Sequence, residues 1–169
     1  SVTMRNMGSV YESLQDYSKA LGYYTQSLQI DRELRNRSTE GVTLNKIGLL
    51  YKAMGDLDSA TFYFDLSLTI ATEIGDKRGV SSALGEIGED LMLKGDLTGA
   101  VEFSEKGLKI AMEIGAVLET KIITSTLYKV YEAQGLTESA FEMYKLFITS
   151  RDSIQNNANN REVIRQEYK

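Results

Sequence analysis

The chain has 169 residues, 42% of them hydrophobic and 25% charged, a balance that excludes disordered and fibrous proteins and suits one domain with a sizeable core. It contains neither cysteine nor histidine, which excludes disulfides, thiol nucleophiles, the usual structural zinc sites and the imidazole base of most catalytic triads. With a formal net charge of -5, the chain has no electrostatic footprint for phosphate backbones, so we expect no direct nucleic-acid binding. The sequence shows no phosphate-cradling glycine loop and no cluster with metal-ligand spacing, so we expect no metal and no cofactor.

The apolar runs of the sequence are short. The longest of them fall well below the roughly 18 to 20 residues of a membrane-spanning helix, and the first residues lack the layout of a signal peptide. We therefore expect no membrane contact within this part of the protein. The absence of cysteine suits the cytosol and an oxidising compartment equally. We favour the cytoplasm and leave the periplasm open, should the parent protein be a membrane sensor.

The sequence repeats itself at a shift of forty residues. Small or turn-forming residues share two columns of this alignment: Gln15, Gly55, Gly95 and Gly135, and then Ala20, Ala60, Ala100 and Ala140. Large apolar residues dominate the columns on either side: Tyr11, Tyr51, Leu91 and Tyr131, and then Leu28, Leu68, Leu108 and Ile148. A third small column holds Gly8, Gly48 and Gly88. We predict four repeats, at residues 1–40, 41–80, 81–120 and 121–157.

Each repeat has the pattern of two amphipathic helices. In the second repeat, apolar residues recur at steps of three or four over 44–54 and again over 57–71. Between these runs, Gly55 suits the left-handed conformation that ends a helix, and Asp56 suits the N-cap of the next one. Gly75 and Asp76 supply a second stop and restart, toward the third repeat.

Two helices joined by so short a turn must approach closely, so the facing positions need small residues. We expect Gly48 and Ala60 to meet in this contact. A single helix pair leaves an apolar face uncovered, and stacked pairs bury it. The sequence therefore predicts an all-α solenoid.

The segment LNKIGLLYKAMGDLDSATFYFDLS, from Leu44 to Ser67, resembles the tetratricopeptide repeat. The large, Leu, Gly, Tyr, Gly-Asp, Ala and Phe positions all stand at the spacing of that family. The resemblance implies a right-handed solenoid of about four antiparallel helix pairs and a non-catalytic module that binds a protein or peptide. The usual unit has about 34 residues, so the longer unit here predicts longer helices.

In this family, the first helices of the repeats line a concave groove, which nominates four residues per repeat. By register they are Arg5, Asn6, Ser9 and Glu12; Asn45, Lys46, Leu49 and Lys52; Gly85, Glu86, Glu89 and Met92; and Ser125, Thr126, Lys129 and Glu132. Asn45 suits hydrogen bonds to a peptide backbone, and Lys46 and Lys52 suit its carboxylates. Lys46 and Glu86 occupy equivalent positions, so mutual pairing is the alternative. The carboxylate clamp of chaperone-tail binders is not met, because Ser9, Lys46, Ser82 and Glu86 stand at its positions.

Glu86, Glu89 and Asp90 form a compact acidic group on one predicted helix. Such a group suits a bound cation or a pair of catalytic acids. A solvated helix face is the simpler interpretation, because no further ligand accompanies the three residues.

The fourth repeat departs from the pattern twice. Tyr128 stands in the glycine column, and Phe147 stands where Ser27, Ser67 and Gly107 occur. These large side chains either pack against a following helix or form an aromatic docking site for a partner; both interpretations stay open.

The C-terminal residues suggest two parent proteins. The Asn-rich stretch 156–160 suits a helix break, so residues 158–169 are predicted to begin a C-terminal capping or linker helix. Its sequence has no stop signal, which predicts a fragment; a native capping helix is the alternative. Residues 131–156 are similar to the final repeat of bacterial sensor proteins with histidine kinase, nucleotide cyclase or DNA-binding outputs. That similarity implies the regulatory part of a larger signalling protein, with a homodimer through the C-terminal helix as an option. A free-standing scaffold or adaptor without an output domain is the alternative.

Overall fold

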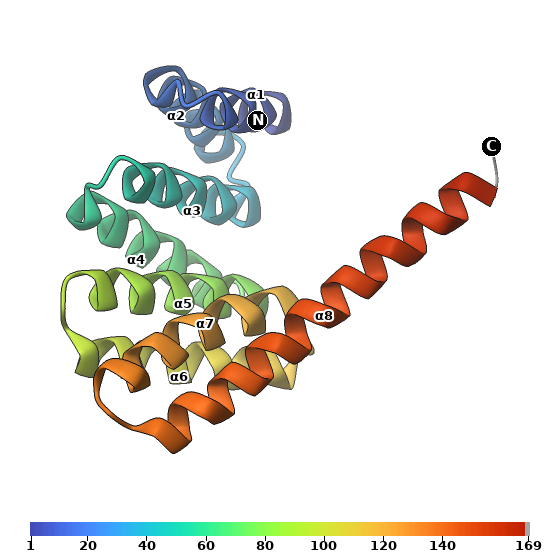
Figure 1. Cartoon of the computed structure of the whole chain (residues 1–169). Helices are drawn as coiled ribbons and strands as arrows, with labels where there is room; N and C mark the ends of the chain where they lie inside the picture. The colour runs from blue at the N-terminus through green and yellow to red at the C-terminus, as the bar shows by residue number, and fades with distance from the viewer. Residues whose placement is uncertain (168–169) are drawn as a thin grey trace.

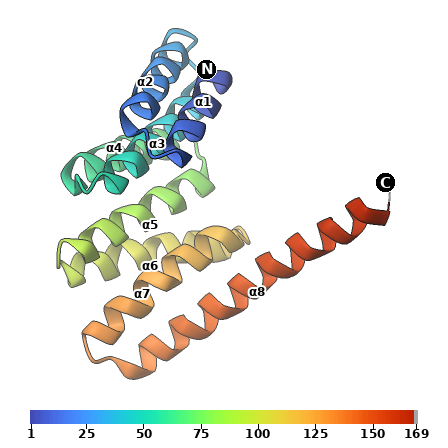
Figure 2. The same ribbon diagram turned by 45° about the horizontal axis from the view of Figure 1, so that its top comes forward.

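The computed structural model describes the backbone of residues 1–167 and the side chains of residues 1–159. Within residues 1–167 it contains eight helices and no strand. They are α1 (Val2–Ser13), α2 (Tyr17–Glu33), α3 (Arg37–Ala53), α4 (Leu57–Glu73), α5 (Lys77–Leu93), α6 (Leu97–Glu113), α7 (Val117–Ala133) and α8 (Thr137–Glu167). Consecutive helices pack together and stack in chain order (Figures 1 and 2). The prediction of an all-α solenoid is confirmed.

A shorter period lies inside the forty-residue repeat. Each helix from α2 to α7 has 17 residues, and three residues separate each helix from the next. The middle residue of every turn has a positive φ. These residues are Gln15, Arg35, Gly55, Gly75, Gly95, Gly115 and Gly135. The helical stops predicted at Gly55 and Gly75 are confirmed, and the structure adds two left-handed residues that are not glycine.

The last turn residue caps the helix that follows. The carboxylate of Asp56 accepts the N–H of Ser59 at 3.1 Å, and that of Asp96 accepts the N–H of Gly99 at 2.9 Å. Each bond satisfies a backbone donor that would otherwise lack a partner in the first helical turn. The predicted caps are therefore confirmed.

Within a helix pair, the close contact joins a glycine to an aromatic ring. A Cβ atom built on Gly48 would lie 2.5 Å from Cε1 of Phe64, and one on Gly8 would lie 2.5 Å from Cε1 of Tyr24. Phe64 is thus the side chain nearest to Gly48, and the expected contact between Gly48 and Ala60 stays a prediction; at the equivalent place, a Cβ atom on Gly88 would lie 3.2 Å from the carbonyl oxygen of Ala100. Ala60 is fully buried in a cluster with Phe64 and Ile87, at the interface with the next pair.

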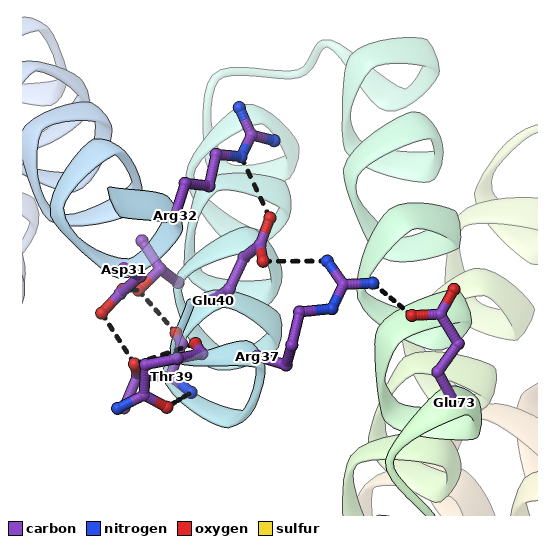
Figure 3. A network of polar contacts seen from close by, with 8 residues as sticks. Asp31, Arg32, Arg37, Thr39, Glu40 and Glu73 are labelled. Atoms are coloured by element: carbon purple, nitrogen blue, oxygen red, sulfur yellow. Dashed lines mark hydrogen bonds and ion pairs between the residues drawn. The ribbon is translucent and has the colours of Figure 1, made fainter. Parts of the chain in front are cut away.

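The first and second helix pairs are also joined by polar groups (Figure 3). Asp31 stands where the second and third repeats have alanine, and its buried carboxylate accepts hydrogen bonds from Thr39 at 2.7 Å and Thr43 at 2.9 Å. Burial alone would raise the pKa of Asp31, but these hydrogen bonds outweigh burial and lower it. Around this centre, Glu40 accepts from Arg32, which ties α2 to α3, and from Arg37 of its own helix, which also pairs with Glu73 of α4.

The last helix is longer than the others. α8 has 31 residues and runs through positions 156–160, so the predicted helix break there is wrong. This stretch contains neither proline nor glycine, and asparagine weakens a helix without forbidding it. The first part of α8 packs on α7, and the rest projects from the body (Figures 1 and 2).

The predicted repeat boundaries at 41, 81 and 121 fall inside helices α3, α5 and α7. The helix pairs begin at residues 37, 77 and 117, four residues before the predicted boundaries at 41, 81 and 121. The division at 157 and 158 stays a prediction, because the side chains of residues 160–169 lie outside the described ones. None of the helices within residues 1–167 combines the length and apolar character needed to cross a membrane.

Two glycine substitutions test the ring contact. Gly48→Ala places a methyl group against Phe64, so we expect it to lower the free energy of unfolding by about 1 to 3 kcal/mol. Gly22→Ala is the matched control, because a Cβ atom there meets nothing within 4 Å and lies in the middle of α2. We expect it to stabilise the protein by about 0.5 to 1 kcal/mol. Urea unfolding measures both, and equal effects of the two substitutions would contradict the contact.

Candidate functional site

The sixteen nominated groove residues all lie on α1, α3, α5 and α7, which we call the first helices. Three of them, Gly85, Glu86 and Thr126, are buried and present little surface to a ligand. Three are exposed, on the first and last of these helices: Asn6, Lys129 and Glu132. The others are partly buried, and several already have partners within the chain.

On α1, the nominated residues support packing. The hydroxyl of Tyr24 donates to the carboxylate of Glu12 at 2.6 Å and lies 3.0 Å from Oγ of Ser9. Burial and this carboxylate raise the pKa of Tyr24 to about 12. Arg5 donates to Thr43 of α3 at 3.4 Å. Asn6 is the exposed member of the four.

On α3 and α5, a lysine is shared by two glutamates. Lys52 forms ion pairs with Glu86 and Glu89, and its side chain is only 17% exposed. Burial alone would lower the pKa of Lys52, but the two carboxylates raise it overall, and burial raises the pKa of Glu86. Glu86 thus pairs with Lys52, and not with Lys46 as suggested from the sequence. Because Lys52 is engaged in these ion pairs, it is not free for the ligand carboxylate that was predicted to bind it.

Asp90 has a different environment from the two glutamates. It is fully buried; its Oδ2 accepts from Thr61 at 3.2 Å, and its Oδ1 has no hydrogen-bond partner among the described residues. Burial raises the pKa of Asp90 to about 6, against the lowering effects of Lys52 and Thr61. The interpretation of the acidic group as a solvated face is therefore wrong for Glu86 and Asp90. In the structure, Glu86 forms a buried ion pair with Lys52, and the buried carboxyl group of Asp90 lies on the next turn of the same helix.

A cavity of about 220 Å³ opens beside Asn45 and Lys46. Its apolar part includes Val42 of α3, Ile70 of α4 and Ile74 of the turn after α4. Polar groups of the first helices complete the lining: Ser38, Asn45, Lys46, Arg78, Ser82 and Glu119. The cavity therefore combines an apolar wall with charged and hydrogen-bonding groups from three successive repeats.

Two acceptors at this cavity lack partners. Oδ1 of Asn45 and Oε2 of Glu119 are buried without a hydrogen bond among the described residues. The nearest cation to Glu119 is Arg78, whose Nη1 lies 3.8 Å from Oε1 and whose side chain is 63% exposed. Because a buried acceptor without a donor is costly, both groups suit N–H donors from a bound segment.

The hollow lies between α3 and α5 because α7 approaches α5 more closely. A Cβ atom on Gly85 would lie 2.7 Å from Cγ1 of Ile123, so glycine permits that approach. Val42, Arg78 and Glu119 also line the cavity and are not among the residues predicted from the sequence. Val42 lies one helical turn before Asn45 and Lys46, and this spacing was the available signal.

Comparisons with known proteins bear on both the repeat and the fold. Residues 1–73 match the family model described as "Tetratricopeptide repeat". Residues 1–73 therefore carry tetratricopeptide repeats, and the recognition of this family is confirmed. The described helices after residue 73 continue the same twenty-residue unit.

Two solved structures share the fold. BtubC (BKLC) from P. vanneervenii superimposes with a TM-score of 0.78 at 17% identity, over 89% of this chain and 61% of BtubC. Aspartyl phosphate phosphatase F from Bacillus subtilis gives a TM-score of 0.83 at 11% identity, over 90% of this chain and 40% of the phosphatase. The chain thus spans less than two thirds of either protein, and the likeness is one of fold. No curated protein matched the sequence.

The two buried aspartates are expected to respond oppositely to neutralisation. The pKa of Asp90 in the folded chain lies above its ordinary value of 3.8, so the folded state binds more protons and the free energy of unfolding falls as pH rises from about 4 to about 6. Asp90→Asn should remove this fall and stabilise the protein by about 1 to 3 kcal/mol above about pH 6.

Asp31→Asn is the matched control, because the pKa of Asp31 is lowered on folding. Its contribution is present above the unfolded-state pKa and is lost as pH falls, so we expect the substitution to destabilise the protein by about 1 to 3 kcal/mol at neutral pH. Urea unfolding at about pH 4 and about pH 7.5 measures both variants. A loss of stability at neutral pH in Asp90→Asn would contradict the account.

Proposed function

We propose that the chain is a non-catalytic module that binds a peptide or protein segment along its first helices. The observation that carries this proposal is the cavity between α3 and α5, with its apolar wall, its two unpartnered acceptors and Lys46 at its edge. Tetratricopeptide repeats generally bind proteins, and this class of ligand suits the arrangement.

The size and lining of the cavity favour a segment of a polypeptide over a free small molecule. Small-molecule pockets usually enclose about 300 to 1,000 Å³, whereas this cavity holds about 220 Å³. One side chain of a bound segment would fill it against Val42 and Ile70. Backbone N–H groups of the segment would donate to Asn45, and a carboxylate of the segment would pair with Lys46.

We further propose that the module is the regulatory part of a larger bacterial signalling protein, with a histidine kinase, a nucleotide cyclase or a transcription regulator as its output. The resemblance of residues 131–156 to final repeats of bacterial sensors supports this role, as does the fold shared with a bacterial aspartyl phosphate phosphatase. Binding would change the curvature of the solenoid or the packing of two copies, and α8 would transmit the change. A free-standing adaptor remains the alternative role.

A peptide-display selection against the immobilised chain tests the binding proposal. We expect enriched peptides with an acidic residue, whose affinity falls at least about tenfold with Lys46→Glu. Lys109→Glu is the matched control on the exposed surface of α6, and it should change affinity less than about twofold. No enrichment, or equal effects of the two lysine substitutions, would contradict a site at this cavity.

The coding sequence that follows residue 169 separates the two roles. A heptad pattern leading to a kinase, cyclase or DNA-binding domain would support the regulatory role. A stop codon directly after residue 169 would remove that role and favour the adaptor.

A further inference from the structure

The C-terminal end of the solenoid presents a group of aromatic side chains. Phe141 is 59% exposed and Tyr144 is 43% exposed, and the Tyr144 ring lies 5.3 Å from that of Tyr128 and 6.4 Å from that of Phe147. We call these four residues the aromatic end face. A hollow of about 400 Å³ lies against Tyr128, Phe141 and Tyr144, and its other walls come from α7 and α8.

In the earlier repeats, the equivalent surface is covered by the first helix of the next pair. Tyr24, which corresponds to Tyr144, is buried in a cluster with Leu44 and Ile47 of α3. Phe64 is likewise buried in a cluster with Ile87 of α5. The aromatic end face is therefore the surface on which this solenoid receives a further first helix, and it is uncovered in the structure.

The distal part of α8 has the wrong composition for a helix that stands alone. Residues 155–159 are exposed, and all of them except Ala158 are asparagine or glutamine. Asparagine is a poor helix former, and a short helix with no apolar face gains nothing from packing. Local sequence preference and the continuous helix therefore disagree at this point.

The twenty-residue period places a turn at the same point. After 17 residues from the start of α8, the next three are Ile154, Gln155 and Asn156, in register with Ile74, Gly75 and Asp76. The chain already uses this chemistry elsewhere. Gln15 occupies a left-handed turn position, and Asn36 caps α3 by accepting the N–H of Thr39.

The residues after this turn partly match a first helix. Val163 falls in the column of Thr43, Ala83 and Ile123, and Ile164 falls in the column of Leu44, Leu84 and Thr124, whose side chains are all buried. Glu167 departs from the pattern, because it stands in the column of Ile47, Ile87 and Leu127.

The uncovered end face, the poor helix-forming sequence of residues 155–159 and the register of the turn and of the residues after it support one inference. We infer that α8 breaks at Ile154–Asn156 in a second state, in which residues 157–167 fold back as a ninth helix and cover the aromatic end face. The continuous helix is the open state and exposes that face. In this inference residues 157–167 act as a detachable cap, independently of ligand binding between α3 and α5.

Spin labels on two introduced cysteines test this inference, because the natural chain has none. Cysteines at Glu138 and Arg165 lie about 40 Å apart in a continuous helix, at about 1.5 Å per residue. In the folded-back state the two labels would lie within about 20 Å, since packed helices are about 8 to 10 Å apart. We expect a distance distribution with both populations.

Substitutions at the turn should shift the two populations. Gln155→Gly permits a positive φ and weakens the helix, so the ratio of short to long distances should rise roughly fivefold or more. Asn156→Ala removes the cap and should lower this ratio. A single distance near 40 Å in the natural sequence and in Gln155→Gly would overturn the inference.

A matched pair of aromatic substitutions tests the covered face. Phe141→Asp should lower the ratio of short to long distances, whereas Phe62→Asp should leave it unchanged, because Phe62 is equally exposed, at 58%, but lies on α4. Equal effects would contradict docking on the aromatic end face. Dilution with unlabelled chain distinguishes folding back within one chain from docking of a second copy. A short distance that disappears on dilution would arise between copies and would overturn the fold-back.

Discussion

The left-handed residue in each three-residue turn is the constraint on which the solenoid depends. It ends one helix and points the chain back along it, and in the first five turns the side chain of the following residue caps the next helix. Because this geometry recurs every twenty residues, all helices from α2 to α7 have one length. Equal lengths bring Gly8 to Tyr24 and Gly48 to Phe64 in the same way. The forty-residue columns of the sequence follow from this spacing.

The same spacing divides the surface between packing and binding. The second helices α2, α4 and α6 contribute rings and small residues to both neighbouring helices, as Phe64 does against Gly48 and Ile87. The first helices carry the polar residues nominated for ligand binding, and some of these residues form ion pairs or hydrogen bonds within the chain. Lys52 is occupied by Glu86 and Glu89, whereas Asn45 and Glu119 keep acceptors without donors. This unused hydrogen-bonding capacity supports the proposal that a partner binds at the cavity.

The fold could be predicted because its determinants are local and repeated, whereas the site depends on side chains from separate repeats. The adjacent residues Gly55 and Asp56 predict a turn by themselves. Gln15 and Arg35 adopt the same left-handed backbone without glycine, so their sequence gives no such signal. Asn45 and Lys46 were found by register. The pairing of Lys52 with Glu86 was not, because it depends on how the next pair is placed. Glu119 was missed for the same reason, since it reaches the cavity from a third repeat.

The stability of two turn variants tests the central role of the left-handed residue most directly. Arg35 has a φ of 52° and Gly95 has a φ of 86°. If this conformation governs the turns, Arg35→Gly should raise the free energy of unfolding by about 0.5 to 1 kcal/mol, and Gly95→Ala should lower it by about 1 to 2 kcal/mol. Urea unfolding of both variants gives the answer. Destabilisation by Arg35→Gly together with no loss in Gly95→Ala would contradict the account.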